Sequence, residues 1–340
     1  MESTESKDYY AITYCYPSHN VSCAKVVRSK PEYMSMYILF SLISVFTVFM
    51  NLLVIISICH FKQLHTPTNL LILSLAISDF MVGLVVIPIE SIKLIESCWY
   101  FGKTFCSIFQ ATVFTVIFVS LYNLVLIAVD RYYAVCEPLR YCSKMTTTKT
   151  LLFIFLIWSY SLIYNLTLLY FNANLYRSQE DSICYGECML VVSFTWGVVD
   201  LIVSFVGPCS VIIGMYMHIL KVAQRQEKSI NTVVGRFKTL ADEPALTKTS
   251  ERKATKTLGI VLFVFTSCWI THYVCVLSEE SISNPSLVIA FLVWILYINS
   301  FLNPIIYAFR YTWFRASVKH ILTLRILDPL SVYDNITTQK

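Results

Sequence analysis

Two aspartates stand inside long apolar stretches of this sequence, where little water is present to solvate a carboxylate. Asp79 lies in the run 68–93 and Asp200 lies in the run 190–221. A carboxylate in such a place needs a cation, a proton or several hydrogen-bond donors around it. The chemistry expected of these residues is therefore the binding of positive charge.

Asp79 has candidate partners in other apolar runs. Ser120, Asn299 and Asn303 supply hydroxyl and amide oxygens, and a hydrated sodium ion among such oxygens would satisfy the carboxylate. The alternative is that these Ser and Asn side chains only form hydrogen bonds between helices. That alternative does not account for Asp79 itself. The sequence therefore predicts a possible sodium site at Asp79, with no other metal and no organic cofactor.

Asp200 precedes Pro208 by eight residues, which is about 12 Å along a helix. Its neighbours Val199 and Leu201 are apolar. One interpretation is that the carboxylate faces a wet crevice without binding anything. We favour the other, in which Asp200 binds a cationic ligand.

Aromatic side chains would complete a cation site, because a cation is attracted to the face of a Trp or Tyr ring. Ordinary core packing explains any single one of them about as well. The candidates in the last two apolar runs are Trp269, His272, Tyr273, Trp294 and Tyr297. Glu90, in the second run, offers a further negative charge. Glu279 and Glu280 offer more, although a solvated loop face explains that pair more simply.

The sequence Asp130-Arg131-Tyr132 ends the third apolar run, and Glu251 opens the sixth run on the same side. Arg and Tyr also serve as anchors at a membrane interface. An arginine between two carboxylates on different helices would instead form a releasable latch. Near the end of the seventh run, Pro304 permits a kink because it removes a backbone hydrogen bond.

The composition indicates that these runs lie in a membrane and not in water. Apolar residues make up 56% of the 340 residues, charged residues make up 14%, and the mean hydropathy is +0.64. Soluble domains carry roughly 25% charged residues, so we expect an integral membrane protein. Runs of about 20 apolar residues predict membrane helices. Seven such runs occur, at 34–60, 68–93, 104–134, 150–172, 190–221, 255–277 and 286–309.

Basic residues set the orientation of these runs. Of the Lys and Arg residues, 19 fall on the side of the C-terminus and 7 on the side of the N-terminus. The richer side is cytoplasmic, so residues 1–33 are predicted to be extracellular, 34–309 to form the bundle and 310–340 to be cytoplasmic. This asymmetry also explains the net charge of +5 without nucleic-acid binding. Asn20 begins a glycosylation acceptor on the outer side, and Tyr311–Leu322 has the pattern of an amphipathic helix on the inner leaflet lipid.

Together these motifs resemble the rhodopsin-like G-protein-coupled receptors. The matching residues are Asn51, Ser78-Asp79, Trp99 before Cys106, Asp130-Arg131-Tyr132, Trp158, Pro208 with Tyr216, Phe265 with Trp269, and Asn303-Pro304 with Tyr307. The loop Cys184-Tyr185-Gly186-Glu187-Cys188 and the stretch Ser250-Glu251-Arg252-Lys253 resemble the trace amine-associated receptors within that family. The resemblance covers most of the chain outside the first twenty residues, the third inner loop and the tail.

This resemblance implies an all-α fold, a seven-transmembrane helix bundle with a short amphipathic eighth helix, in the plasma membrane. It implies a small protonated amine as ligand and a heterotrimeric G-protein, stimulatory or olfactory, that raises cyclic AMP. It implies that Pro138 and Leu139 dock the G-protein. Activation would release Arg131 from Asp130 and Glu251, with Tyr216, Phe265, Pro304 and Tyr307 taking part.

The resemblance also implies two disulfides, Cys106–Cys188 and Cys23–Cys184. Cys15 is a rival of Cys23 for the second of these bridges, and sequence alone does not fix the connectivity. Cys15 and Cys98 are left without a clear partner.

One position departs from the family pattern. Amine receptors of this kind carry an aspartate seven residues after the bridging cysteine of the third helix, and here that position is Val113. Valine cannot pair with an ammonium group. The pattern resembles a group of fish trace amine-associated receptors in which the anchor lies on the fifth helix, so Asp200 is expected to pair with the amine. An aminergic neurotransmitter-like receptor is the alternative.

Two other classes of membrane protein fit the sequence less well than a receptor does. A transporter would usually show more spans, internal repeats or helices broken by Gly and Pro. An intramembrane enzyme would need a metal set or a nucleophile with its base, and neither an HExxH nor a GxSxG motif occurs. The sequence therefore predicts a receptor and no enzyme.

Overall fold

The fold is described from a computed structural model of the chain. It describes residues 13–178, 184–188, 194–236, 299–308 and 311–334, together with positions 267, 270, 294, 297 and 336. Within these residues, five helices are long and apolar enough to cross a membrane. They span Lys30–His60, Pro67–Glu96, Gly102–Cys136, Thr147–Phe171 and Thr195–Arg225. They correspond to the first five predicted runs, while most of the sixth and part of the seventh lie outside the described residues.

The first membrane helix, α1, spans Lys30–His60, and its start is set by local chemistry. The Ser29 hydroxyl accepts a hydrogen bond from the Glu32 backbone, and the Glu32 carboxylate accepts one from the Ser29 backbone. This reciprocal pair satisfies backbone N–H groups that a helix start otherwise leaves open. Pro31 occupies the first turn, where no N–H is needed.

The second and fifth spans each contain a wider π-helical turn. The second runs as α2 Pro67–Met81, the π turn η2 Val82–Val86, and α3 Ile87–Glu96. The fifth runs as α7 Phe194–Leu201, the π turn η4 Ile202–Val206, and α8 Gly207–Arg236. Each π turn ends two residues before a proline, Pro88 or Pro208, whose missing N–H interrupts the regular hydrogen-bond ladder. Asp79 and Asp200 each stand just before such a turn.

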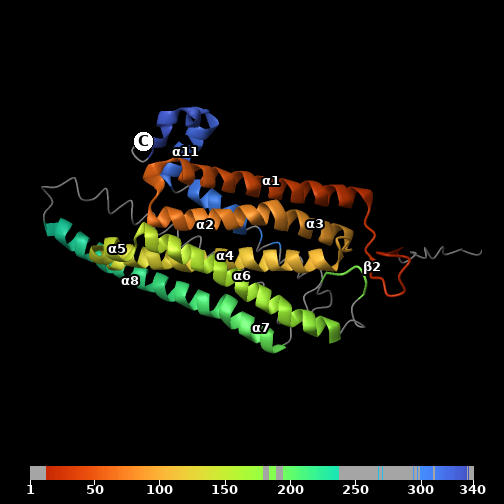
Figure 1. Cartoon of the computed structure of the whole chain (residues 1–340). Helices are drawn as coiled ribbons and strands as arrows, with labels where there is room; N and C mark the ends of the chain where they lie inside the picture. The colour runs from red at the N-terminus through yellow and green to blue at the C-terminus, as the bar shows by residue number, and fades with distance from the viewer. Residues whose placement is uncertain are drawn as a thin grey trace, which may run out of the picture.

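Helix α4, Gly102–Cys136, lies at the centre of the described bundle. It packs against α2, α8 and α6, which spans Thr147–Ser178. Figure 1 shows these long helices side by side, with α1 along one edge of the bundle. α1 approaches the η2 turn closely at Gly83, whose carbonyl accepts a hydrogen bond from Ser44 at 2.8 Å. A β-carbon at Gly83 would lie 3.0 Å from both the Thr47 side chain and the Val48 backbone nitrogen, so a larger residue would have to push α1 and the η2 turn apart slightly.

The apolar core divides into an inner and an outer part. The inner cluster includes Leu75, Leu124, Ile212 and Phe314 from four different helices. The outer cluster includes Trp99, Phe109, Val113, Trp294 and Tyr297. Burial of such side chains out of contact with lipid fixes the rotation of each helix about its axis.

Two segments fold beyond what the sequence predicted. The fifth apolar run is predicted to end at residue 221, yet helix α8 continues through the polar stretch to Arg236. Its residues Ala223, Gln224 and Glu227 favour helix and no proline interrupts them. The short helix α5, Pro138–Lys144, occupies the second inner loop.

The ends of the chain form two small structures at opposite ends of the bundle. Strands β1 Thr13–Tyr14 and β2 Ala24–Lys25 pair as an antiparallel hairpin on the outer side. On the inner side, α11 Thr312–Leu322 is followed by two 3-10 helices, η6 Arg325–Leu327 and η7 Pro329–Tyr333. Figure 1 shows this tail beside the inner end of α1.

Candidate functional site

Asp79 lies fully buried between the second and seventh spans. The Asn303 side-chain amide donates a hydrogen bond to Asp79 Oδ2 at 2.8 Å. Ser120 is buried beside Ser78, with 2.9 Å between their hydroxyl oxygens, and it also interacts with the Asp79 carboxylate. The structure therefore brings Asp79, Ser120 and Asn303 together, as the sequence predicted. Asn299 is buried one turn before Asn303 on the same helix.

Several buried oxygens of this cluster have no hydrogen-bond partner among the described residues. They are Asp79 Oδ1, Asn299 Oδ1 and Asn303 Oδ1. A buried carboxylate or amide oxygen left without a partner is unfavourable by about 1–3 kcal/mol. Oxygen atoms are the ligands that hard cations such as sodium prefer, so the donor set fits the ion. Asn51 does not join this set directly: its amide donates to the Thr47 and Ser300 carbonyls and ties α1 to the seventh span.

A second buried carboxylate, Asp130, closes the inner end of α4. It accepts hydrogen bonds from Arg131 Nε at 2.9 Å, from the Thr68 hydroxyl at 2.7 Å and from the Tyr141 hydroxyl at 2.9 Å. Asp130 and Arg131 therefore form one half of the predicted latch. Glu251, the other half, lies outside the described residues. Burial and the Asp130 charge raise the pKa of Tyr141, so its phenol stays a hydrogen-bond donor at neutral pH.

The other predicted switch residues occupy the inner half of the bundle. Tyr216 is half-buried against the inner cluster, and Tyr307 is buried in it. Residues 299–308 are helical through Pro304. Phe265 lies outside the described residues.

The second inner loop presents an apolar side chain to solvent. Helix α5 begins at Pro138, and the Leu139 side chain is 99% exposed. An apolar residue this exposed is suited to contact with a partner protein. Docking of the G-protein at Pro138 and Leu139 stays a prediction of the resemblance.

Asp200 lies near the outer end of the fifth span. Its Oδ1 accepts hydrogen bonds from Ser204 at 2.7 Å and from Tyr164 of α6 at 3.1 Å. The η4 turn begins two residues after Asp200 and carries Ser204. Tyr164 is packed against Phe118 of α4, with 5.3 Å between ring centroids. The carboxylate is therefore held by Ser204 of its own span and by Tyr164 of α6, whose ring is in turn packed against α4.

Val113 lies in the outer apolar cluster and is buried. The same cluster holds Trp294 and Tyr297, whose rings meet edge to face with 5.6 Å between centroids. Trp294 also stacks on Phe40 of α1 at 3.9 Å. Of the predicted aromatic residues these two are thus near Val113, while Trp269, His272 and Tyr273 lie outside the described residues, as do Glu279 and Glu280.

Glu90 of α3 lies at the edge of this outer cluster. Its carboxylate is mostly buried and lies 3.7 Å from the Lys93 ammonium on the same helix. It also interacts electrostatically with the buried Tyr297. Glu90 is therefore a negative charge close to the predicted aromatic residues.

Three disulfides tie the outer side together. Cys106–Cys188 and Cys23–Cys184 are both present, as the resemblance implied. The third, Cys15–Cys98, resolves the two cysteines that the sequence left unassigned, so Cys15 is not the partner of Cys184. The N-terminal hairpin brings Cys15 to the loop after α3, where Trp99 N–H also donates to the Gly186 carbonyl.

The N-terminal segment is also held by polar contacts. Lys25 pairs with Glu96 at 2.8 Å, and the Tyr16 hydroxyl donates to the Trp99 carbonyl at 3.0 Å. Asn20 lies in an exposed turn of this segment, where a glycan has room. Together with the disulfides, these contacts fix a cover over the outer cluster.

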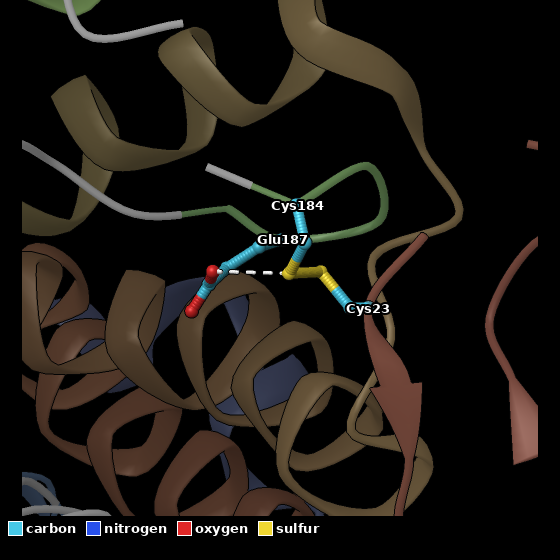
Figure 2. Close-up of side chains that lie close together, drawn as sticks. All are labelled: Cys23, Cys184 and Glu187. Atoms are coloured by element: carbon cyan, nitrogen blue, oxygen red, sulfur yellow. Dashed lines mark hydrogen bonds between the residues drawn. A yellow bond between two sulfur atoms is a disulfide. The ribbon is translucent and has the colours of Figure 1, made fainter. Parts of the chain in front are cut away.

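One group on this cover has the residue types of a metal site. Figure 2 shows the Cys23–Cys184 bridge with the Glu187 carboxylate turned toward the Cys184 sulfur, 3.6 Å away. Metal ions bind cysteine as the thiolate, and both sulfurs are already in a disulfide. The group is therefore structural.

Four of the residues that hold the Asp200 and Asp130 carboxylates were not predicted from the sequence. Ser204 follows Asp200 by four residues and so shares its helix face, which was a readable signal. Tyr164, Thr68 and Tyr141 come from other helices, and nothing in their local sequence marks them. Their roles depend on how the helices pack.

Comparisons with known proteins agree with this architecture. The profile of the 7 transmembrane receptor (rhodopsin family) matches residues 50–307. The chain is 38% identical to trace amine-associated receptor 13c of Danio rerio over 339 residues, 98% of each chain. It is 38% identical to trace amine-associated receptor 4 of Mus musculus, covering 92% of each chain. It is 37% identical to trace amine-associated receptor 1 of Homo sapiens, covering 93% of this chain and 95% of the relative.

The Asp79 cluster yields a prediction about sodium. We expect sodium chloride, compared with choline chloride, to raise the thermal unfolding midpoint of the purified protein, because an ion that binds only the folded state stabilises it, by about 2.7 kcal/mol at 100 times its dissociation constant. Asp79→Asn should remove this dependence while keeping the shape of the side chain. Asp328→Asn, at an exposed tail position, is the control and should keep it. Equal midpoints of the wild type in the two salts would contradict a sodium site.

Proposed function

The chain belongs to the trace amine-associated receptors of the rhodopsin family, and on that premise we propose that it detects protonated amines through Asp200. Members of this family are multi-pass plasma membrane receptors that bind a small ligand outside the cell and a heterotrimeric G-protein inside. They are receptors and not enzymes. The proposal concerns what the family alone leaves open, which is the ligand, the residue that anchors it and the G-protein.

The position of the buried charges carries this proposal. Asp200 is a fixed carboxylate near the outer end of the fifth span, oriented by Ser204 and Tyr164. Val113 is apolar and buried, so the third helix offers no carboxylate at the position where amine receptors usually have one. A protonated amine would therefore pair with Asp200 and extend toward the cluster of Trp294 and Tyr297, whose rings attract a cation. Val113 also argues against the aminergic neurotransmitter-like alternative.

Asp200→Ala should abolish the cyclic AMP response to amines in cells that express the receptor. Loss of one partner of a buried charge pair costs about 2–5 kcal/mol, which corresponds to a roughly 30-fold or greater rise in the half-maximal concentration. Tyr164→Phe is the matched control, since it removes one hydrogen bond and keeps the carboxylate, and its shift should be much smaller. Surface expression is measured for both variants. An unchanged dose response of Asp200→Ala would exclude Asp200 as the anchor.

We further propose that the preferred ligands are diamines or polyamines. Glu90 is a second carboxylate beside the outer aromatic cluster, and its neighbour Lys93 is 3.7 Å away and partly exposed. A second ammonium group could replace Lys93 as the partner of Glu90 while the first pairs with Asp200. Both ends of such a ligand would then be neutralised.

A series of alkyl diamines with increasing chain length tests this proposal. Potency should rise to a maximum at one length and exceed that of the monoamine of equal length, because only that length spans both carboxylates. Glu90→Gln should remove the advantage of the diamine and leave the monoamine response unchanged. The absence of any preference for diamines in the wild type would discard this version and leave the Asp200 proposal standing.

On the inner side we propose coupling to a stimulatory or olfactory G-protein, with an olfactory role for the receptor. Leu139 is available on α5 for the G-protein contact. Arg131, held by Asp130, would act as the releasable part, since family members switch between two arrangements of the inner helix ends. Tyr141 and Thr68 stabilise the held arrangement by donating to the same carboxylate.

Weakening the latch should raise signalling without ligand. Tyr141→Phe removes one hydrogen bond to Asp130, a change of about 1 kcal/mol, and should raise basal cyclic AMP by up to a few fold. Glu251→Ala tests the other half of the latch in the same assay. Ser143→Ala, an exposed position on the same short helix, serves as the control. Basal activity that stays at the wild-type level in both variants would argue against the latch.

A further inference from the structure

The cytoplasmic tail folds back onto the inner end of α1 through its two 3-10 helices. His60 Nε2 lies 2.8 Å from the Ser331 hydroxyl oxygen, and Lys62 Nζ donates to the Tyr333 hydroxyl at 2.7 Å. Gln63 donates to the Asp334 backbone carbonyl at 2.5 Å. These contacts join residues 271 positions apart in the sequence.

Apolar burial fixes the same face of the tail. Ile336 is fully buried, in one cluster with Phe61 and Leu64 of the first inner loop. Ser331 is 2% exposed. This face of η7 therefore packs against the first inner loop, and the opposite face of η7 points away from the receptor.

The face turned away from the receptor is apolar and exposed. Leu324, Leu327 and Leu330 are between 68% and 74% exposed. They recur at every third position, which matches the three residues per turn of the 3-10 helices that contain or adjoin them. We call these three leucines the tail stripe. A soluble surface rarely carries several large apolar side chains together without a partner.

The location of the tail stripe points to lipid as that partner. Figure 1 shows the tail outside the bundle, alongside the inner end of α1. α1 carries exposed apolar side chains such as Phe49 and Leu52, as expected where a helix meets acyl chains. The tail therefore lies beside a helix that faces lipid.

Charge around the tail stripe also suits the cytoplasmic leaflet. Arg315, Lys319 and Arg325 are exposed on α11 and η6, and such side chains favour anionic headgroups. Asp328 is the exposed acid among them, and its carboxylate is used to cap the Leu330 backbone N–H at 2.9 Å. Residues 309–340 contain no cysteine, so no attached thioester lipid can anchor this segment.

We propose that the tail stripe is a membrane-inserting element, which inserts into the anionic inner leaflet while Ser331, Tyr333 and Asp334 are held to the receptor by His60, Lys62 and Gln63. The tail thereby holds the first inner loop to the membrane beside α11. This inference concerns the tail alone and does not depend on the amine or the G-protein.

The test places an environment-sensitive fluorescent amino acid at position 330 of the full-length receptor. The receptor is reconstituted in nanodiscs that contain phosphatidylcholine with or without phosphatidylserine. Lipids with a nitroxide on the acyl chain quench a probe that is inserted, and aqueous iodide quenches a probe in water. The matched control is the same probe at position 139, another exposed leucine on the cytoplasmic side.

We expect lipid quenching at position 330 to exceed that at position 139 severalfold, and iodide quenching to show the reverse order. Because position 330 is exposed, the probe should not disturb folding, and position 327 provides a second site for the same reading. Equal iodide quenching at 330 and 139 in nanodiscs, which contain no cytoplasmic partner protein, would overturn the proposal and leave the tail stripe to a protein partner.

The anionic part of the proposal has its own readout. Phosphatidylserine should increase lipid quenching at position 330, and the double variant Lys319→Gln, Arg325→Gln should lose that increase. Quenching in the wild type that is equal with and without phosphatidylserine would show that headgroup charge has no part in seating the tail.

Discussion

A bilayer core offers no water to a polar side chain, and this constraint shapes the whole receptor. Each carboxylate inside the bundle must be met by donors or cations from other helices, because an isolated charge there is strongly unfavourable. Asp79 is met by Asn303, Asp130 by Arg131 with Thr68 and Tyr141, and Asp200 by Tyr164 and Ser204. These three groups lie in the middle, the inner end and the outer end of the bundle. Polar chemistry is concentrated there, and apolar packing fills the space between.

Two wide turns follow the aspartates of the second and fifth spans. A π turn begins three residues after Asp79 and another begins two residues after Asp200, each with a proline farther along the helix. Such a turn shifts the face of the helix that follows it. Ser204 lies four residues after Asp200, the spacing of one helix face, and donates to its carboxylate. The local spacing therefore pairs these two residues, whereas Asp79 depends on Asn303 of another span.

The two ends of the chain add constraints that the membrane helices lack. Outside, three disulfides and the Lys25–Glu96 pair hold the N-terminal segment over the outer cluster. Inside, the tail closes on the first inner loop through His60, Lys62 and Gln63. Covalent bridges are available only on the oxidising outer side. The inner end instead relies on hydrogen bonds, buried Ile336 and contact with the membrane.

The sequence by itself determined the membrane helices, their orientation and the buried carboxylates, because hydropathy and isolated charge act over short stretches of chain. It also marked Val113 as an apolar residue where an anchor was expected. Only the tertiary structure decided which donors meet each carboxylate and that Cys15 pairs with Cys98, since these partners come from distant segments. In the sequence, Tyr164 is one residue of an apolar run and Tyr141 is one residue of a loop. Only the packing of the helices directs their hydroxyl groups toward Asp200 and Asp130. The fold of the tail could not be predicted from the sequence either, because its leucines are mixed with polar residues. Only the contacts with His60, Lys62 and Gln63 show which face packs against the receptor.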